Sequence, residues 1–300
     1  MSSLSQMKIP PEAFAFPYRP ACVLWVTGND AATFLQGQFT NDLGSIVGGA
    51  SVYGLWLDRK GRVIGDSWVT RAPDDSGFWI VSPSCGAEAI SGHLGRHIIA
   101  DEVEVTDETS AWAAIALAGE GTGAWLASEA RPGFFFRGRR SAAETFEWIL
   151  PAGDAAAALA ATSAARTASF EDMERLRILS GIPAVPADIG ASDLPNEGGL
   201  DADAISYSKG CYTGQEVMAR IKALGRVRRT LVRVAGTGSR PALPAGLWQG
   251  ERREGEVRSA VPDGSGFAGL ALVSVASAAS GSPFALEPAG AASVEICPKS

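Results

Sequence analysis

The C-terminal part of the chain places the strongest constraint on the fold. From Arg228 onward, short apolar segments alternate with stretches rich in Gly, Pro and Ser. These segments cover residues 230–234, 255–260, 269–275 and 294–296. Several short strands at such spacing are typical of a small β-barrel or a β-sandwich. We therefore predict that residues 229–300 form a small β-barrel or β-sandwich domain after a first region of residues 1–228.

The first region mixes strand and helix patterns. Strands are predicted at 23–26, 52–57, 63–70, 78–82, 103–106 and 112–118, and helices near 31–35 and at 87–95, 155–165 and 170–179. Asn29 or Asp30 can cap the first helix, and Gly181 and Pro183 end the last one. The residues Asp58 to Gly61 form a turn between two strands. The expected fold class is α+β.

Charge limits the classes of partner. The 300 residues carry a formal net charge of −7 with 46% hydrophobic residues, which is typical of a soluble globular protein and argues against a general nucleic-acid binder. A short basic run is the local exception. It contains Arg220, Lys222, Arg226, Arg228, Arg229 and Arg233. The run is either a solvated helix face and strand edge or a rim that attracts an anionic ligand tail or partner.

The four cysteines are far apart, and no two of them form a C-x-x-C pair. They are Cys22, Cys85, Cys211 and Cys297. This spacing argues against a zinc knuckle, an iron–sulfur cluster held by this chain alone and a disulfide scaffold. His93 and His97 share a predicted helix face but lack a third ligand, so no metal site is predicted.

Two segments bear on localisation. Residues 1–16 lack a basic region followed by an apolar one, so no secretory signal is predicted. The uncharged stretch 264–286 is rich in Ser, Gly and Ala and contains strand positions, not a membrane span. We expect a reduced, cytoplasmic protein.

One octet carries the clearest chemical signal. It reads Lys209-Gly210-Cys211-Tyr212-Thr213-Gly214-Gln215-Glu216. Thr213 and Glu216 have the spacing of a capping box, and Gly225 offers a C-terminal stop, so a helix is predicted here. Cys211 is then expected just outside a helix N-terminus and beside Lys209, and both the dipole and the cation favour a thiolate. The alternative is a small buried cysteine that only packs.

The octet and four further blocks resemble the YgfZ family of folate-binding proteins. The blocks cover residues 28–42, 61–66, 177–183 and 194–197. Mitochondrial relatives of this family take part in iron–sulfur protein maturation, and its superfamily includes the aminomethyltransferase (T-protein) of the glycine cleavage system. The transferase branch generally lacks the cysteine and the Gly-Gln-Glu run. The resemblance implies a multi-lobed folate-binding region followed by a small C-terminal β-barrel.

The resemblance also implies residues that bind tetrahydrofolate or a one-carbon derivative of it. Glu197 is expected to pair with the pterin, and Arg177 to clamp the glutamate tail or hold Glu197. The alternative for Arg177 is a structural ion pair in the helix layer. Met173 replaces an aromatic residue of some relatives and is expected to cover the pterin face. Further cofactor-binding candidates from the octet are Tyr212, Gln215 and Glu216.

Three positions are candidate catalytic residues. They are Cys211, Lys209 and Asp66. Asp66 matches an acidic position that lies near the reactive nitrogens of folate in the transferases, although a strand aspartate can simply face solvent. With no histidine in the motif, activation of Cys211 falls to Lys209, the helix end and Arg220.

The leading hypothesis is a folate-binding accessory protein for the synthesis or repair of iron–sulfur enzymes, including tRNA-modifying ones, that acts through Cys211. Its expected partners are folate and iron–sulfur enzymes or assembly proteins, without direct nucleic-acid binding or membrane attachment. One alternative is a folate-dependent aminomethyl or methyl transferase with Asp66 as acid–base. Another is a non-catalytic folate sensor. The sequence leaves open whether the protein is an enzyme.

Overall fold

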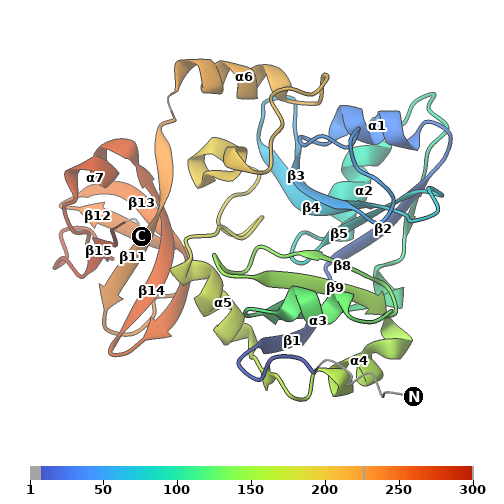
Figure 1. Ribbon diagram of the computed structural model, residues 1–300. Coiled ribbons are helices and arrows are strands. Elements are labelled where there is room, and N and C mark those ends of the chain that lie inside the picture. The colour runs from blue at the N-terminus through green and yellow to red at the C-terminus, as the bar shows by residue number, and fades with distance from the viewer. Residues whose placement is uncertain (1–7, 226, 299–300) are drawn as a thin grey trace. The chain divides into compact units, whose positions relative to one another are not determined.

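The computed structural model describes residues 8–225 and 227–298, and Figure 1 shows their arrangement. The chain forms two compact units. The first comprises the segment up to Pro20 together with Glu108–Ile182, and the second comprises Ala21–Asp107 and everything from Pro183 onward. Arg226 of the basic run and the first seven residues of the N-terminal segment lie outside the described residues.

The first unit is built on a five-stranded sheet. Its strands, in spatial order, are β10 (Arg166–Thr167), β1 (Phe14–Tyr18), β7 (Trp112–Ala118), β9 (Thr145–Pro151) and β8 (Phe134–Arg137). Its helices are α3 (Thr122–Ala127), α4 (Ala155–Ala161) and α5 (Phe170–Leu179). Only the β1–β10 pair is parallel among these described strands. Trp125, Leu126 and Trp148 anchor its core.

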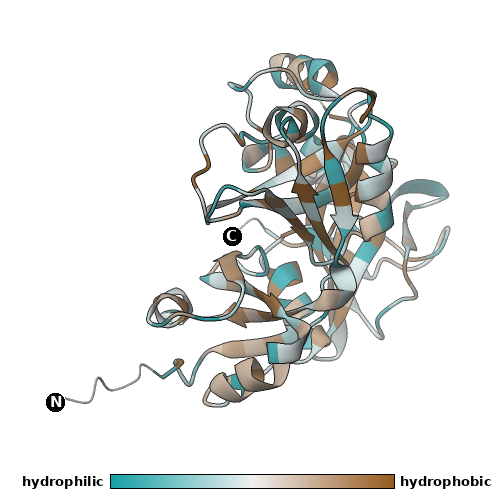
Figure 2. Ribbon diagram, turned by 90° about the vertical axis from the view of Figure 1, so that its right-hand side faces the viewer, coloured by the Kyte–Doolittle hydropathy of each residue, from teal (hydrophilic) through white to brown (hydrophobic). Residues whose placement is uncertain are grey.

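The second unit contains a second five-stranded sheet. The spatial order is β3 (Ser51–Leu57), β4 (Val63–Arg71), β5 (Phe78–Ser82), β2 (Cys22–Thr27) and β6 (Glu104–Asp107), with antiparallel pairing throughout. Helices α1 (Ala31–Gln38) and α2 (Ala87–Gly95) contribute Leu35 and Ile90 to its core, where both are fully buried with Phe39 and Trp56. Figure 2 shows how hydrophobic residues concentrate along the strands.

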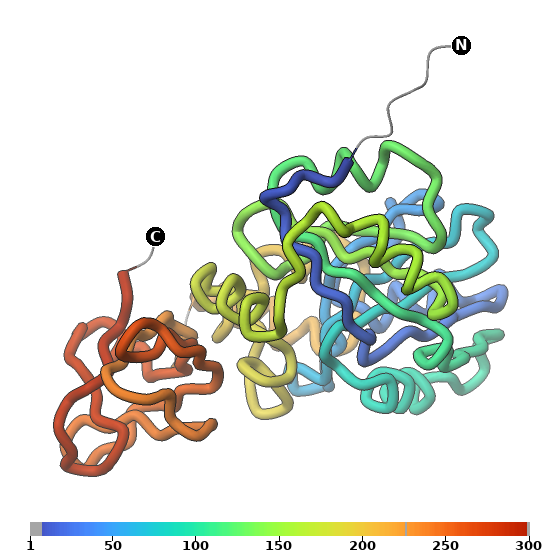
Figure 3. The backbone as a smooth tube through the Cα atoms, turned by 90° about the horizontal axis from the view of Figure 1, so that it is seen from below, coloured from blue at the N-terminus to red at the C-terminus, as the bar shows by residue number. Residues whose placement is uncertain are grey.

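A third sheet, also in the second unit, confirms the predicted C-terminal β structure. Its order is β12 (Ala245–Gln249), β13 (Arg252–Asp263), β14 (Gly266–Ser274), β11 (Arg229–Thr237) and β15 (Val294–Ile296), and α7 (Val275–Ser280) follows β14. Phe284 bridges to Val294 and Ala285 bridges to Trp248, so one short segment connects the two edge strands. The curled chain in Figure 3 is therefore barrel-like, with Phe284 fully buried inside.

The predicted α+β class is confirmed, and most predicted elements are present within one to three residues at each end. The prediction missed strands β1, β8, β9, β10 and β12 and helices α3 and α7. Pro17 lies in β1, which is a central strand of its sheet. Proline has no backbone N–H to donate to a neighbouring strand, so it is unusual at such a position. The fold tolerates it because the short β10 pairs only with Phe14 and Ala15.

Candidate functional site

The octet leads into helix α6 (Gln215–Leu224) in a way that differs from the predicted capping box. Gly214 is the N-cap with φ 87° and no side-chain cap bond, while Thr213 donates its hydroxyl to Gln38 Oε1 at 3.0 Å. A Cβ at Gly214 would lie 2.8 Å from the Asp58 carbonyl oxygen, so this close approach requires glycine. The capping-box prediction is therefore wrong, because the helix begins one residue later than expected. The stop at Gly225, with φ 62°, is confirmed.

Lys209 fastens the octet to the chain that follows α1. Its Nζ donates to the carbonyl oxygens of Gln36, Phe39 and Asn41 at 2.7, 2.6 and 2.9 Å. These are carbonyls at and after a helix C-terminus, where a cation is favourable. Burial lowers the pKa of Lys209 to about 8, although nearby Asp42 pulls in the opposite direction. Its ammonium therefore fixes the loop through neutral oxygens.

Cys211 is exposed and opens into a shallow pocket of about 480 Å³. The pocket, here called the thiol pocket, is lined by Gly37, Arg59 and residues 211–216. The alternative of a buried packing cysteine is excluded for Cys211. That alternative does describe Cys22 and Cys85, which are buried; desolvation raises the pKa of Cys85 to about 11 and that of Cys22 still further.

The β3–β4 turn packs against the start of α6 and contributes Arg59 to the thiol pocket. The Asp58 Oδ1 accepts the amides of Lys60 and Arg62, both at 2.8 Å, which fixes the turn. Gly61 has φ 74°, and a Cβ there would lie 2.8 Å from the Met218 side chain of α6. The turn and the helix are thus closely packed, and Arg59 reaches the thiol pocket as a result.

Asp66 lies on β4 and is only 9% exposed, so it does not face solvent as the alternative proposed. Its Oδ2 accepts from the Tyr53 hydroxyl at 2.9 Å, and its Oδ1 accepts from the Ser82 hydroxyl at 3.3 Å. The Ser82 oxygen also accepts the Cys85 amide at 3.0 Å. Asp66 is therefore a buried carboxylate that accepts bonds from two hydroxyl groups.

Glu197 lies in the short 3-10 helix Pro195–Gly198 and forms a bidentate pair with Arg229. The Arg229 Nε and Nη2 lie 3.0 and 2.8 Å from the two carboxylate oxygens. Glu197 also accepts the Leu194 amide at 3.0 Å. The guanidinium that holds Glu197 is therefore Arg229 of the C-terminal sheet, a residue that the sequence placed only in the basic run.

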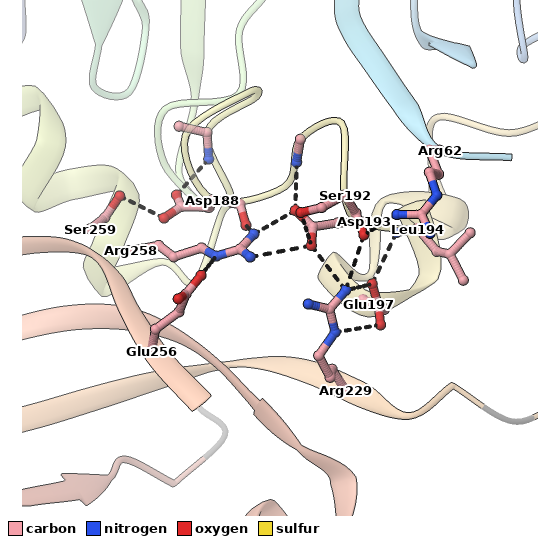
Figure 4. Close-up of polar contacts among 12 residues, drawn as sticks. Arg62, Asp188, Ser192, Asp193, Leu194, Glu197, Arg229, Glu256, Arg258 and Ser259 are labelled. Carbon is pink, nitrogen blue, oxygen red and sulfur yellow. Dashed lines mark hydrogen bonds and ion pairs between the residues drawn. The ribbon is translucent and has the colours of Figure 1, made fainter. Parts of the chain in front are cut away.

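Residues 188–197, here called the braced segment, are tied to the C-terminal sheet by further polar contacts (Figure 4). Arg258 pairs with Asp193 and Glu256, and the Ser259 hydroxyl donates to Asp188 at 2.6 Å. Burial alone raises the pKa of Asp193, but bonds from Arg258 and the Gly190 amide outweigh it and hold that pKa below its ordinary value. Asp193 and Arg258 were not among the predicted site residues, because no local pattern relates residues so distant in the chain.

Met173 and Arg177 belong to the first unit, on α5, whereas the other candidate residues belong to the second. Met173 is 1% exposed and packs in a cluster with Ala116 and Ala168. Arg177 pairs with Glu174 of its own helix at 2.6 Å and donates to the Ile182 carbonyl at 2.7 Å. The structural ion pair weighed for Arg177 is therefore present.

The Tyr212 hydroxyl of the octet is buried and lacks a hydrogen-bond partner in the described part of the chain. Tyr212 is 6% exposed, and burial followed by repulsion from Tyr207 raises its pKa. Buried polar groups normally find a partner, so this hydroxyl marks a place where a polar group of a ligand or a water fits.

Neither a cluster of metal-ligating side chains nor a helix able to cross a membrane occurs among residues 8–225 and 227–298. No group of three His, Cys, Asp or Glu residues is placed to hold a metal ion across residues 8–225 and 227–298. His93 of α2 and His97, which follows the end of that helix, have ring centroids 4.7 Å apart, and burial lowers the pKa of His93 to about 4. Over the same residues, none of the helices has the length and apolar composition needed to span a bilayer.

The three sheets and their helices define a protein with the fold of the glycine cleavage aminomethyltransferase. Residues 21–130 match the family described as GCVT N-terminal domain. The crystal structure of glycine cleavage system aminomethyltransferase T from Bartonella henselae superposes with a TM-score of 0.78 over 95% of this chain and 85% of that chain. Sequence identity to it is 20%, so this likeness concerns the fold.

Curated relatives specify the branch. The tRNA-modifying protein YgfZ of Escherichia fergusonii is 30% identical over 258 residues, which cover 79% of this chain and 77% of the relative. The mitochondrial iron-sulfur cluster assembly factor IBA57 of Homo sapiens is 28% identical over 269 residues, with coverage of 84% and 74%. This chain belongs to the YgfZ family, as the octet and its accompanying blocks predicted.

Proposed function

We propose that this protein is a tetrahydrofolate-binding accessory factor for the synthesis or repair of iron–sulfur enzymes, including tRNA-modifying ones, and that Cys211 is its essential group. The observation that carries the proposal is the exposure of Cys211 in the thiol pocket, while Cys22 and Cys85 are buried. The relatives support the class of client, because their names refer to tRNA modification and iron–sulfur cluster assembly.

The proposal assigns the folate to residues that fit its chemistry. The pterin edge is rich in hydrogen-bond donors, which suits the Glu197 carboxylate, and the unpartnered Tyr212 hydroxyl is a further polar contact. Gln215 and Glu216 are the remaining proposed binding residues in the second unit. When bound, folate supplies one-carbon chemistry at its reactive nitrogens.

The chain's own groups have distinct tasks in this proposal. Lys209 holds the octet in place through three carbonyls, so that Cys211 is presented at a fixed position with its side chain exposed. Arg59 places a positive charge in the thiol pocket, which suits an anionic ligand. We place this activity in the cytoplasm, where thiols are kept reduced.

The test measures an iron–sulfur enzyme in cells. A strain that lacks the endogenous protein receives wild-type protein, Cys211→Ser or the matched control Cys297→Ser, whose cysteine is half-buried and outside the octet. The expected result is loss of iron–sulfur enzyme activity with Cys211→Ser alone, at equal protein levels. Full activity with Cys211→Ser would contradict the proposal.

A folate-dependent aminomethyl or methyl transferase is the second candidate, favoured by the buried, hydroxyl-bonded Asp66 and by the aminomethyltransferase-like fold. This function requires turnover of a one-carbon donor by the purified protein with folate. Turnover that Asp66→Asn abolishes and Cys211→Ser leaves intact would favour it over the accessory role. A binding protein without chemistry would lose only folate affinity with either class of substitution.

A further inference from the structure

The β3–β4 turn contributes to a second pocket, which differs from the thiol pocket in charge. Lys60, the neighbour of Arg59, lines this pocket of about 750 Å³ in the second unit. We call it the cationic pocket, after the basic side chains that line it. These are Lys60, Arg62, Arg228, Arg229, Arg252 and Arg253.

The charges of the cationic pocket are not balanced. Six basic side chains face two acidic ones, Glu197 and Glu254, which leaves a formal excess of four positive charges in a chain whose net charge is −7. The basic residues come from the β3–β4 turn, the start of β11 and the start of β13. The fold therefore assembles one positive site from three distant segments against the overall charge of the protein.

Three of these cations lack an acidic partner. The side chains of Lys60 and Arg228 have no hydrogen-bond or ion-pair partner among residues 8–225 and 227–298, and Arg62 donates to the neutral carbonyl of Ser192 at 2.8 Å. In contrast, Arg229, Arg252 and Arg253 pair with Glu197, Glu254 and Glu256. An anion bound in this pocket would contact arginines already held by carboxylates. It would also give Lys60, Arg62 and Arg228 the anionic partner that they lack within the described residues.

The size of the pocket selects the kind of anion. A volume of about 750 Å³ lies in the range of small-molecule sites, and Leu194, Val217 and Val227 supply apolar wall. A nucleic acid needs an extended basic surface, and the negative net charge opposes its approach. A compact anion needs no extended surface, and its few charges can be matched by the local positive excess of the pocket.

We propose that the cationic pocket binds a small polyanion that carries at least two phosphate or carboxylate groups. Lys60, Arg62 and Arg228 supply the unpaired charge, and Arg229 and Arg252 orient the ligand from the wall. The basic run of the sequence thereby serves as a binding rim through Arg228 and Arg229. This site does not depend on the chemistry of Cys211, and it shares Glu197 with the proposed pterin contact.

Isothermal titration calorimetry with the full chain tests the proposal. The probes are inorganic tripolyphosphate and γ-linked tetraglutamate, at an ionic strength of about 0.15 M. We expect a Kd below about 1 mM for at least one probe, and a loss of about tenfold or more in the double variant Lys60→Gln/Arg228→Gln. Preference for tripolyphosphate identifies a phosphate ligand, and preference for tetraglutamate identifies a carboxylate ligand; either supports the site.

The matched control is Arg240→Gln, which removes an exposed cation outside the pocket and is expected to leave binding within about twofold. Both substituted residues are exposed, and thermal unfolding checks that each variant is folded. The single variants Lys60→Gln and Arg228→Gln replace the double variant if it does not fold. The absence of binding for both probes, or equal weakening by Arg240→Gln, would overturn the proposal. Binding of tRNA that the pocket variants weaken, without competition by either small probe, would also overturn it.

Discussion

Two segments of the second unit, the braced segment and the octet, are fixed by opposite means. In the braced segment the carboxylates are the fasteners, because Asp188, Asp193 and Glu197 all accept bonds from the C-terminal sheet. In the octet the fasteners are Lys209, which bonds three backbone carbonyls, and Gly214, which packs against a turn. The octet is therefore anchored without Cys211, whereas the braced segment is anchored through its own carboxylates.

The largest expected effect concerns Asp193, which is 1% exposed and binds both Arg258 and Arg229. Asp193→Ala leaves two guanidinium groups without this partner, and removal of one member of a buried pair costs about 3–5 kcal/mol. We expect a drop of that size in the free energy of unfolding, measured by urea denaturation. A loss below about 1 kcal/mol would show that ion pairs do not fix the braced segment.

The same bonds predict a sensitivity to acid. Because the pKa of Asp193 is below its ordinary value in the folded state, the unfolded chain takes up the proton first as the pH falls. The stability supplied by Asp193 is therefore present above the ordinary pKa and is lost as the pH falls through the folded one. Asp193→Asn removes this dependence, so its unfolding midpoint should change less between pH 5 and pH 3 than that of the wild type. Parallel curves for the two proteins would contradict the assignment.

Gly214 tests how the octet is held. A residue with a Cβ at φ 87° pays about 1–2 kcal/mol for the left-handed backbone, and this Cβ also approaches the Asp58 carbonyl oxygen at 2.8 Å. We expect Gly214→Ala to lower the free energy of unfolding by about 2 kcal/mol and to reduce iron–sulfur enzyme activity. Gly210→Ala is the control, since a Cβ there meets no atom within 4 Å. Equal effects of the two substitutions would remove the special role of Gly214.

Lys209→Met has a smaller expected effect on stability. It removes three hydrogen bonds from a half-buried ammonium, each with a net value of about 1 kcal/mol, but it also removes the cost of burying the charge. We expect a net loss of about 1–2 kcal/mol, together with faster amide hydrogen exchange across the octet. Unchanged exchange in the octet would show that Lys209 is not its anchor.

The sequence predicted the presence of both segments but not the way in which each is held. Local patterns predicted strands β3 to β5 and the ends of helix α5, because periodicity and caps are encoded by neighbouring residues. The partners of Glu197 and Asp193 lie at Arg229 and Arg258, and local patterns do not relate such distant residues. The predicted capping box was wrong for a related reason, because the packing of Gly214 against the β3–β4 turn overrides the local preference for Thr213.

The smallest expected effect on stability is that of Cys211→Ser. The Cys211 side chain is exposed, so its replacement by a hydroxyl of similar size is expected to change the free energy of unfolding by less than about 0.5 kcal/mol. Cys85→Ser is the contrast, because it places a hydroxyl in a buried site and is expected to cost more than about 1 kcal/mol. Urea denaturation of both variants measures the difference. A large loss with Cys211→Ser would mean that the thiol is part of the structural anchor, and the comparison between the two segments would fail at its central residue.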